Sequence, residues 1–347
     1  MSHIKALIEK LSLAFGPSGC EGEVAGLIRH ELKGLPVELT SDRMGNLIAH
    51  LKGPEGAPRV MLSAHMDEVG FMITEIEKEG FLRFSTLGGI DPRVLVGRAV
   101  SVGNEDKRTL GIISAKGIHF QSAEERKKLP KIEEMYIDLG VSSREEAEGL
   151  VALGDFATFD TRFVEFGKDK AYFSGKALDD RVGCAILVEV LRAAVEKKPN
   201  LDLWFAFTVR EELGISGATV VANRISPDVA VVLETTAIAD LPSVDASRRV
   251  ASVGEGGVLS LLDRGTIYDR DLIDAMLGAA KERGLPVQVK RYVSGGNDAK
   301  NIQRTGVGVR CLAFSLPTRY LHAPVSVGKY SDVEAMVELL SAMLETM

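Results

Sequence analysis

The most constraining feature of this sequence is an apolar run that stops at two adjacent carboxylates. Residues 203–209 read Leu-Trp-Phe-Ala-Phe-Thr-Val, and Glu211 and Glu212 follow after one arginine. A run of this length, rich in aromatic and β-branched residues, predicts a strand that is buried on both faces. Ligands of open α/β sheets bind beyond the carboxyl ends of such strands, so the two carboxylates are candidate site residues. The alternative is a solvated turn, because charged residues are usually exposed.

Other predicted strands end in a similar way. The apolar run from position 59 ends at His65, with Asp67 two residues later, and the run from position 228 ends at Glu234. A fourth run, residues 309–316, is followed by His322. Each of these residues taken alone also has a structural explanation, as a hydrogen-bonded histidine or an exposed charge. Their recurrence at strand ends favours a shared site.

A pair of aspartates, Asp179 and Asp180, precedes a predicted helix with apolar residues at helical spacing. One carboxylate at this position is explained as a helix cap. Two adjacent carboxylates are not both explained in this way, so one of them is a further candidate.

These segments together supply a donor set that suits a pair of divalent cations. The chain has only six histidines, and two of them follow predicted strands. Buried strand ends that carry such side chains are costly unless the charges are paired or bind cations. Two imidazoles with three carboxylates suit Zn²⁺, Co²⁺ or Mn²⁺. Two neighbouring cations need a shared carboxylate, which leaves one glutamate free as a base. The candidates are His65, Asp67, Asp179, Glu211, Glu212, Glu234 and His322.

Composition argues against several other classes of protein. The net charge is −7 and there is no long basic cluster, which argues against a nucleic-acid partner. No apolar run approaches the ~20 residues of a membrane span, and the N-terminus lacks a signal-peptide core. The three cysteines, Cys20, Cys184 and Cys311, are odd in number and far apart. They indicate a reduced compartment, so we expect a cytoplasmic protein.

The order of predicted elements indicates an α/β domain with a small all-β domain inserted into it. Strands alternate with helices up to residue 70 and again from residue 164. Between them, short alternating strands and glycine-containing turns predict a β-barrel or sandwich. We therefore predict a catalytic α/β domain of residues 1–70 and 164–347. The inserted barrel-like domain of residues 71–163 lacks a comparable grouping of histidines and carboxylates, so we expect it to serve assembly and access to the cleft.

Four segments resemble the tetrahedral dinuclear metallo-aminopeptidases, a family that includes glutamyl aminopeptidases and members labelled endoglucanases. The segments are Ser63-Ala-His-Met-Asp-Glu-Val-Gly70, Lys176-Ala-Leu-Asp-Asp-Arg-Val-Gly183, Val209-Arg-Glu-Glu-Leu-Gly214 and Arg319-Tyr-Leu-His-Ala-Pro324. The resemblance covers nearly the whole chain, including the β insertion. It implies a mixed-sheet α/β metallopeptidase domain that binds two divalent metal ions per subunit.

The resemblance also implies a role for each candidate residue. His65 is a ligand of one metal, Asp179 bridges the two, and His322 completes the second. Glu212 and Glu234 each hold one metal. In their catalytic roles, Glu211 is the general base and Asp67 is the carboxylate that orients His65. Position 234 is usually Asp in the family and position 297, here Asn297, is commonly Thr, so the chain departs from the pattern at both places.

The implied activity is removal of N-terminal residues from short peptides. An alternative is the deacylation of N-acyl amino acids at the same dinuclear site. A glycosidase is a weaker alternative, because sugar cleavage needs no metal pair. A non-catalytic protein in which metal only staples the fold is disfavoured, because a closed structural site has no use for a spare base. The resemblance further implies a homo-oligomer, a tetrahedral dodecamer built through the β insertion.

Overall fold

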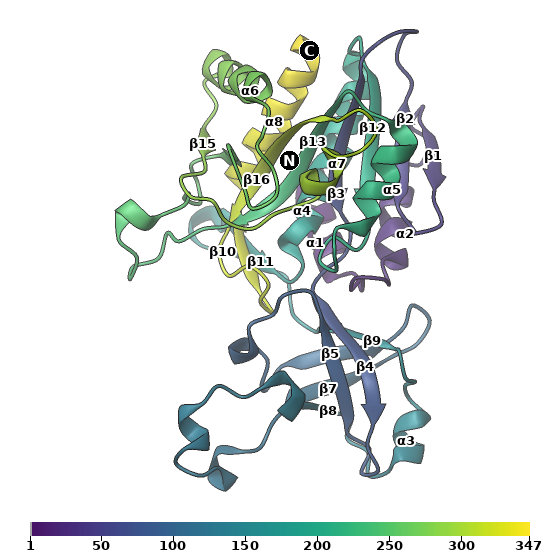
Figure 1. The fold of residues 1–347 in the computed structure, drawn as a ribbon, viewed down its shortest axis with the longest axis vertical. Helices are drawn as coiled ribbons and strands as arrows, with labels where there is room; N and C mark the ends of the chain where they lie inside the picture. The colour runs from purple at the N-terminus through teal and green to yellow at the C-terminus, as the bar shows by residue number, and fades with distance from the viewer. Residues whose placement is uncertain (1) are drawn as a thin grey trace.

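The computed structural model describes residues 2–347, which form an α/β body and a small β-barrel (Figure 1). The barrel interrupts the α/β body in sequence and lies below it in the figure. Eight helices are present among the described residues: α1 (Ser2–Leu13), α2 (Gly22–Glu31), α3 (Arg144–Glu148), α4 (Leu178–Lys197), α5 (Ser216–Ile225), α6 (Arg270–Arg283), α7 (Ala299–Ile302) and α8 (Tyr330–Thr346).

A central sheet of eight strands organises the α/β body. Its order is β1-β2-β12-β3-β13-β16-β14-β15. Strands β12, β3, β13 and β16 are parallel neighbours. Strand β2 runs antiparallel to β1 and β12, and β14 runs antiparallel to β16 and parallel to β15, so the sheet is mixed as expected. The strands are β1 (Glu38–Ser41), β2 (Leu47–Leu51), β3 (Arg59–His65), β12 (Asp202–Thr208), β13 (Val229–Ala237), β14 (Gly257–Leu259), β15 (Val287–Val289) and β16 (Arg310–Thr318).

The apolar run for which the sequence predicts a doubly buried strand is β12. Phe205 and Phe207 on this strand are fully buried. Helix α4 packs against the neighbouring strands β3 and β13, and its own buried residues cover most of its length. Truncating a phenylalanine to alanine in such a core costs about 3–5 kcal/mol. The ends of these strands are therefore held by a rigid, well-packed layer.

One predicted strand end is wrong in position. Glu234 does not end its strand, because β13 continues to Ala237. The following residues, Thr235 and Thr236, are β-branched and pair with β16 at Leu316 and Pro317. Alternation of apolar and polar residues could not reveal this extension, since the threonines are buried beside a partner strand. Glu234 projects from within the sheet and not from a turn.

The inserted segment closes into a six-stranded barrel in the order β4-β5-β8-β7-β6-β9. The barrel has its own hydrophobic cluster, which includes Phe71, Val100, Ile137 and Phe159. A separate sheet of three strands, β10-β11-β17, lies in the α/β body. These strands are β4 (Gly70–Ile76), β5 (Leu82–Leu87), β6 (Ala99–Gly103), β7 (Arg108–Ser114), β8 (Tyr136–Asp138), β9 (Phe156–Phe159), β10 (Val164–Phe166), β11 (Tyr172–Gly175) and β17 (Ser326–Lys329).

A buried ion-pair network joins the barrel to the α/β body. Glu68 Oε1 accepts from Lys176 Nζ at 2.5 Å and from Arg181 Nη2 at 3.4 Å. Its other oxygen accepts from the hydroxyl of Thr158 on barrel strand β9 at 2.7 Å. Breaking a buried ion pair by removing one partner typically costs about 3–5 kcal/mol. This network fixes the start of the barrel close to the strand that carries His65.

No helix among the described residues combines the length and the apolar character that crossing a bilayer requires. The three cysteines are free and buried.

Candidate active site

The candidate residues come from separate segments that meet at the carboxyl end of the parallel strands. His65 is the last residue of β3, and Glu211 and Glu212 lie in the turn after β12. Asp179 lies at the start of α4, and His322 follows β16. The structure brings three overlapping groups of candidate ligand atoms within 4.8 Å of one another: His65 with Glu211 and Glu212, His65 with Asp179 and Glu234, and Asp179 with Glu212 and His322.

Asp179 lies between the two histidines. Its Oδ1 is 3.3 Å from His65 Nε2, and its Oδ2 is 3.2 Å from His322 Nε2. Each side of the site also has one glutamate. Glu234 Oε2 lies 3.9 Å from His65 Nε2, and Glu212 Oε1 lies 3.0 Å from His322 Nε2. The five side chains thus form two sets that share one carboxylate.

Backbone carbonyls determine which nitrogen of each histidine faces the site. His65 Nδ1 lies 3.1 Å from the carbonyl oxygen of Asp67, and His322 Nδ1 lies 2.9 Å from that of Gly89 in the barrel. A carbonyl oxygen can only accept, so both Nδ1 atoms carry the proton and donate it. In the neutral ring the Nε2 lone pair then points at the carboxylates, the arrangement typical of metal-binding histidines.

The spacing of these atoms is compatible with metal ligands as well as with hydrogen bonds. Ligand atoms bound about 2.0–2.1 Å from a tetrahedral zinc lie about 3.3 Å from one another. The three shorter separations in the site, between 3.0 and 3.3 Å, match this value. The donor set of two imidazoles and three carboxylates therefore fits a pair of divalent cations.

Buried carboxyl groups outnumber the positive groups available to them. Burial raises the pKa of Glu211 and of Glu234 well above the usual range, and that of Glu212 in the same direction. Burial alone would lower the pKa of His65, but Glu234, Asp179 and the neighbouring Asp67 raise it well above its ordinary value. All four pKa values rise, because protons are favoured where buried negative charge lacks a compensating cation.

Several buried carboxylate oxygens near the site have no hydrogen-bond partner among the described residues, which also indicates a shortage of positive charge. Glu212 Oε1 makes no hydrogen bond, although His322 Nε2 lies nearby, and Oδ2 of Asp180 and Oδ1 of Asp298 also lack a partner in residues 2–347. A buried polar atom without a partner is costly, and a bound cation would satisfy such oxygens. The excess of unpaired buried carboxylate is concentrated at this one edge of the sheet.

The two adjacent aspartates differ in their contacts: one caps the helix and the other faces the histidines. Asp180 Oδ1 accepts from the backbone N–H of Gly183 at 3.1 Å, which is a capping contact. Asp179 makes no capping bond and contacts the histidines instead. The helix-cap explanation therefore applies to Asp180, and Asp179 belongs to the site.

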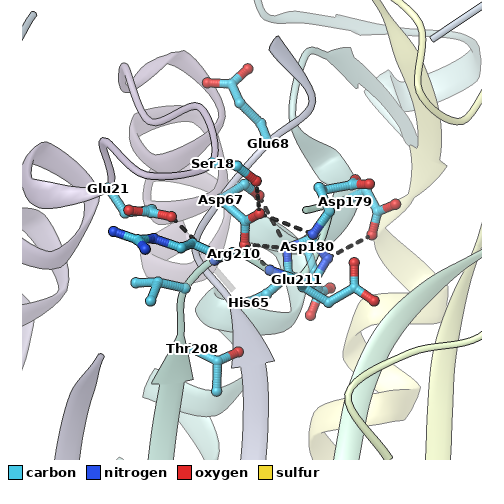
Figure 2. A network of polar contacts seen from close by, with 12 residues as sticks. Ser18, Glu21, His65, Asp67, Glu68, Asp179, Asp180, Thr208, Arg210 and Glu211 are labelled. Atoms are coloured by element: carbon cyan, nitrogen blue, oxygen red, sulfur yellow. Dashed lines mark hydrogen bonds and ion pairs between the residues drawn. The ribbon is translucent and has the colours of Figure 1, made fainter. Parts of the chain in front are cut away.

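Asp67 contacts more of the site than the predicted single partner. Its Oδ1 lies 3.4 Å from His65 Nδ1, farther than its own carbonyl oxygen, so the carboxylate is a secondary acceptor for that ring. The carboxylate accepts from the backbone N–H groups of Glu211 at 3.0 Å and Glu212 at 3.1 Å (Figure 2). Asp67 thus holds the backbone of both glutamates.

Sequence patterns do not reveal every buried acid near the site. Asp298 accepts from the hydroxyl of Thr208 at 2.7 Å, and burial raises its pKa to about 6. Glu21, in the loop before α2, is also buried beside Asp67. Asp298 follows a glycine-rich stretch whose sequence indicates only the lining of a cleft, and no local pattern distinguishes Glu21 from a helix-start carboxylate.

A cleft of about 410 Å³ opens beside these residues. Its lining includes four of the candidate carboxylates, Asp179, Glu211, Glu212 and Glu234, together with His322, Asp263, Lys290 and Asn297. Lys290 donates to the carbonyl oxygen of Ser294 at 3.0 Å and is the one lysine of the lining. The cleft therefore has the size of a small-ligand site and direct access to the histidine–carboxylate cluster.

Comparison with known proteins identifies the family. The sequence profile of the M42 glutamyl aminopeptidase family matches residues 45–339. A lysyl aminopeptidase of Pyrococcus furiosus is 31% identical over 98% of this chain and 96% of its own length.

Solved structures agree with the sequence match. A TET aminopeptidase from a marine-sediment Thaumarchaeota archaeon superimposes with a TM-score of 0.96 at 32% identity, covering 100% of this chain and 97% of its own. The TET1 peptidase of Pyrococcus horikoshii, which assembles into a tetrahedron or a large octahedral shell, gives 0.89 at 35% identity, with 99% and 100% covered. This chain belongs to the M42 peptidase family and is a peptide-hydrolysing enzyme of the aminopeptidase type.

Proposed function

We propose that this chain is an aminopeptidase that removes N-terminal residues from short peptides with the help of two divalent cations per subunit. The observation that carries the proposal is the position of Asp179, whose two oxygens each face Nε2 of a different histidine. A single carboxylate between two imidazoles is what a pair of close cations requires as its shared ligand.

The two ligand sets follow from the distances. His65 and Glu234 would hold one cation, His322 and Glu212 the other, and Asp179 both. Imidazole and carboxylate donors suit Zn²⁺ or Co²⁺, and Mn²⁺ is compatible with the same set. When bound, such cations polarise the scissile carbonyl and bring the pKa of water near neutrality. The longer side chain at position 234, compared with the usual aspartate of the family, reaches the cluster from within β13.

Glu211 is the residue proposed to move the proton. It lines the cleft beside the ligand Glu212 and is not needed to complete either of the two ligand sets. As general base it takes a proton from the attacking water, and as general acid it then gives that proton to the leaving amine. Burial raises the pKa of Glu211, which makes its carboxylate a stronger base towards the attacking water. Asp67 holds the Glu211 backbone in place for both steps.

A substrate panel tests the activity directly. Aminoacyl 4-nitroanilides and short peptides with a free N-terminus should be hydrolysed, and the same compounds with an acetylated amine should not. Loss of hydrolysis on chelation and its return with Zn²⁺, Co²⁺ or Mn²⁺ are the expected controls. Faster cleavage of N-acyl amino acids than of any free-amine substrate would establish the deacylase alternative in place of this proposal.

We further propose that residues 71–163 act as an assembly domain and that the subunits form a homo-oligomer, such as the tetrahedron reported for the relative TET1. The loop after β7 exposes apolar side chains, with Phe120 79% exposed. Phe120→Glu should reduce the particle mass measured by multi-angle light scattering. Lys128→Glu changes the charge of the same loop without removing an apolar side chain, and should leave the mass unchanged. An unaltered mass in Phe120→Glu would contradict the use of this surface.

A further inference from the structure

The turn that carries Glu211 departs from regular backbone geometry immediately before that residue. Strand β12 ends at Thr208, and Arg210 has a positive φ of 56°. A non-glycine residue in the left-handed region is strained and persists only where surrounding contacts impose that conformation. The contacts that impose this conformation therefore bear on where the carboxylate of Glu211 lies.

Four successive backbone N–H groups in this turn are held by side chains from elsewhere in the chain. The amide of Val209 donates to Asn46 Oδ1 at 3.0 Å, and the amide of Arg210 donates to Glu21 Oε1 at 3.2 Å. The next two amides, of Glu211 and Glu212, both donate to the carboxylate of Asp67 (Figure 2). Each amide of residues 209–212 therefore has a side-chain acceptor that helps to define the shape of the turn.

The loop before α2 supplies two of the groups in this arrangement. Ser18 donates its hydroxyl to Asp67 Oδ2, the oxygen that also accepts from Glu212. Glu21 Oε1 accepts from Gly19 N at 2.7 Å as well as from Arg210 N, so one oxygen ties the loop to the turn. In Figure 2, Glu21 lies on the side of Arg210 away from Asp179, and Ser18 lies next to Asp67.

Both groups are sealed from water. Ser18 is 2% exposed, Glu21 5% and Asp67 fully buried. Hydrogen bonds are stronger where water cannot compete for them and where the acceptor is charged or lies near a charge. Burial, followed by the nearby charge of Asp67, also raises the pKa of Glu21 to about 7.

We propose that Ser18 and Glu21 are positioning residues for the hydrolytic reaction: they hold the 209–212 turn so that the carboxylate of Glu211 is aimed into the cleft. Neither touches the candidate ligands, and each acts through one intermediary, Ser18 through Asp67 and Glu21 through Arg210. The inference rests on the proposed role of Glu211. Displacing a catalytic group by about 1 Å can cost on the order of 100-fold in rate, so the effect should be large although the residues are remote from the substrate.

Three variants of the full-length, metal-loaded protein test this role. Glu21→Ala removes the acceptor for Arg210 and should lower kcat about 10- to 100-fold, with KM and bound metal within twofold of the parent. Glu21→Gln keeps an oxygen that can accept the same two amides, so kcat should recover to within about threefold. Glu23→Ala is the matched control, since its carboxylate contacts Phe15 and Arg108 and not the turn. Its kcat should stay within twofold.

Hydrogen exchange gives a readout that does not depend on turnover. The amides of residues 209–212 should exchange at least tenfold faster in Glu21→Ala than in the parent or in Glu23→Ala. Ser18→Ala deletes a single hydroxyl and should accelerate the same exchange by a smaller factor. This variant provides the readout in case Glu21→Ala does not fold. Unchanged exchange in both variants overturns the inference. So does a kcat of Glu21→Ala within twofold of the parent, or a fall in kcat that only follows loss of metal.

The outcome is separable from that of the proposed function. A parent protein inert towards every free-amine substrate would remove the aminopeptidase proposal, and with it the catalytic role of Glu211. The exchange measurement would still decide whether Ser18 and Glu21 hold the turn.

Discussion

The two ends of the central sheet both gather histidine and aspartate, yet they differ in how these charges are satisfied. At the amino end of β12, Asp202 accepts from His50 Nε2 at 2.7 Å, from Gly53 N at 3.0 Å and from Trp204 Nε1 at 2.9 Å. Burial raises the pKa of Asp202, but these three donors outweigh it and lower the pKa overall. The His50 ring also stacks on Trp204, with centroids 3.7 Å apart.

The carboxyl end has the opposite balance. Its carboxyl groups exceed its donors, so the pKa values of Glu211, Glu212 and Glu234 rise and one oxygen of Glu212 is left unpartnered. The comparison shows that a His–Asp pair at a strand end does not by itself mark a reactive site. What marks the site is buried carboxylate that the protein's own groups do not neutralise.

Removing metal should have the largest effect, and it should act at the carboxyl end of the sheet, where buried carboxylate oxygens lack partners within residues 2–347. Chelation should abolish hydrolysis, and Zn²⁺, Co²⁺ or Mn²⁺ should restore it. It should also destabilise the protein, because a cation that binds only the folded state adds about 4 kcal/mol at 1,000 times its dissociation constant. Activity assays and urea unfolding with and without chelator measure both effects. Full activity in exhaustively chelated protein would show that the carboxylates at the carboxyl end need no cation for hydrolysis.

Glu211→Gln should have the next largest effect. General acid–base groups typically contribute about 10²–10⁴-fold, so kcat should fall by about that factor while bound metal is retained. Steady-state kinetics and metal analysis of the same sample test this. Near-parental turnover in Glu211→Gln would exclude this residue as the base.

The pH dependence of stability should differ between metal-free and metal-loaded protein. Glu211 and Glu234 have pKa values raised by burial, so in metal-free protein they stabilise the fold below their unfolded pKa of about 4.3. That contribution is lost as pH rises through their folded values, because the folded state then holds more protons than the unfolded state. His65 acts with the same sign, since its folded pKa is also raised. Metal-free protein should therefore lose stability as pH rises above about 4.3, as measured by urea unfolding.

Bound cations should weaken or reverse this trend, because they favour the ionised carboxylates. Metal-free protein that became more stable over the same pH range would show that the carboxyls of the site are already neutralised by other groups.

The smallest effect on activity is expected from a substitution at the amino end of β12. Asp202→Asn weakens a carboxylate with three donors, and should cost about 1–3 kcal/mol in the free energy of unfolding. Its kcat/KM should stay within twofold of the parent, because the residue lies at the other end of β12 from Glu211. A loss of activity comparable to that of Glu211→Gln would mean that the two edges are not functionally distinct.

Local patterns in the sequence are sufficient to predict the parts of the site that lie at strand ends. The apolar runs before His65 and Glu211 predict buried strands, and a buried strand must deliver its next residue to the sheet edge. The mixed α/β fold is predictable for the same reason, since strands and helices alternate along the chain. The assignment of metal ligands goes further only through resemblance to a known family.

The remainder depends on tertiary contacts that leave no local pattern. The two threonines after Glu234 look like a polar turn, which predicts a strand end there, and only pairing with β16 makes them strand. Ser18 and Glu21 lie in a glycine–proline loop, and their partners are almost 50 and 190 residues away. Asp298 is buried under Thr208, a contact that the sequence around neither residue indicates.

The central claim is tested most directly by measuring how many metal ions each chain binds and where they bind. Crystals of protein reconstituted with Zn²⁺ and measured at the zinc absorption edge should show two anomalous peaks per chain. Asp179 should lie between them, with His65 and Glu234 at one peak and His322 and Glu212 at the other. A single peak, or peaks held by other residues, would contradict the account.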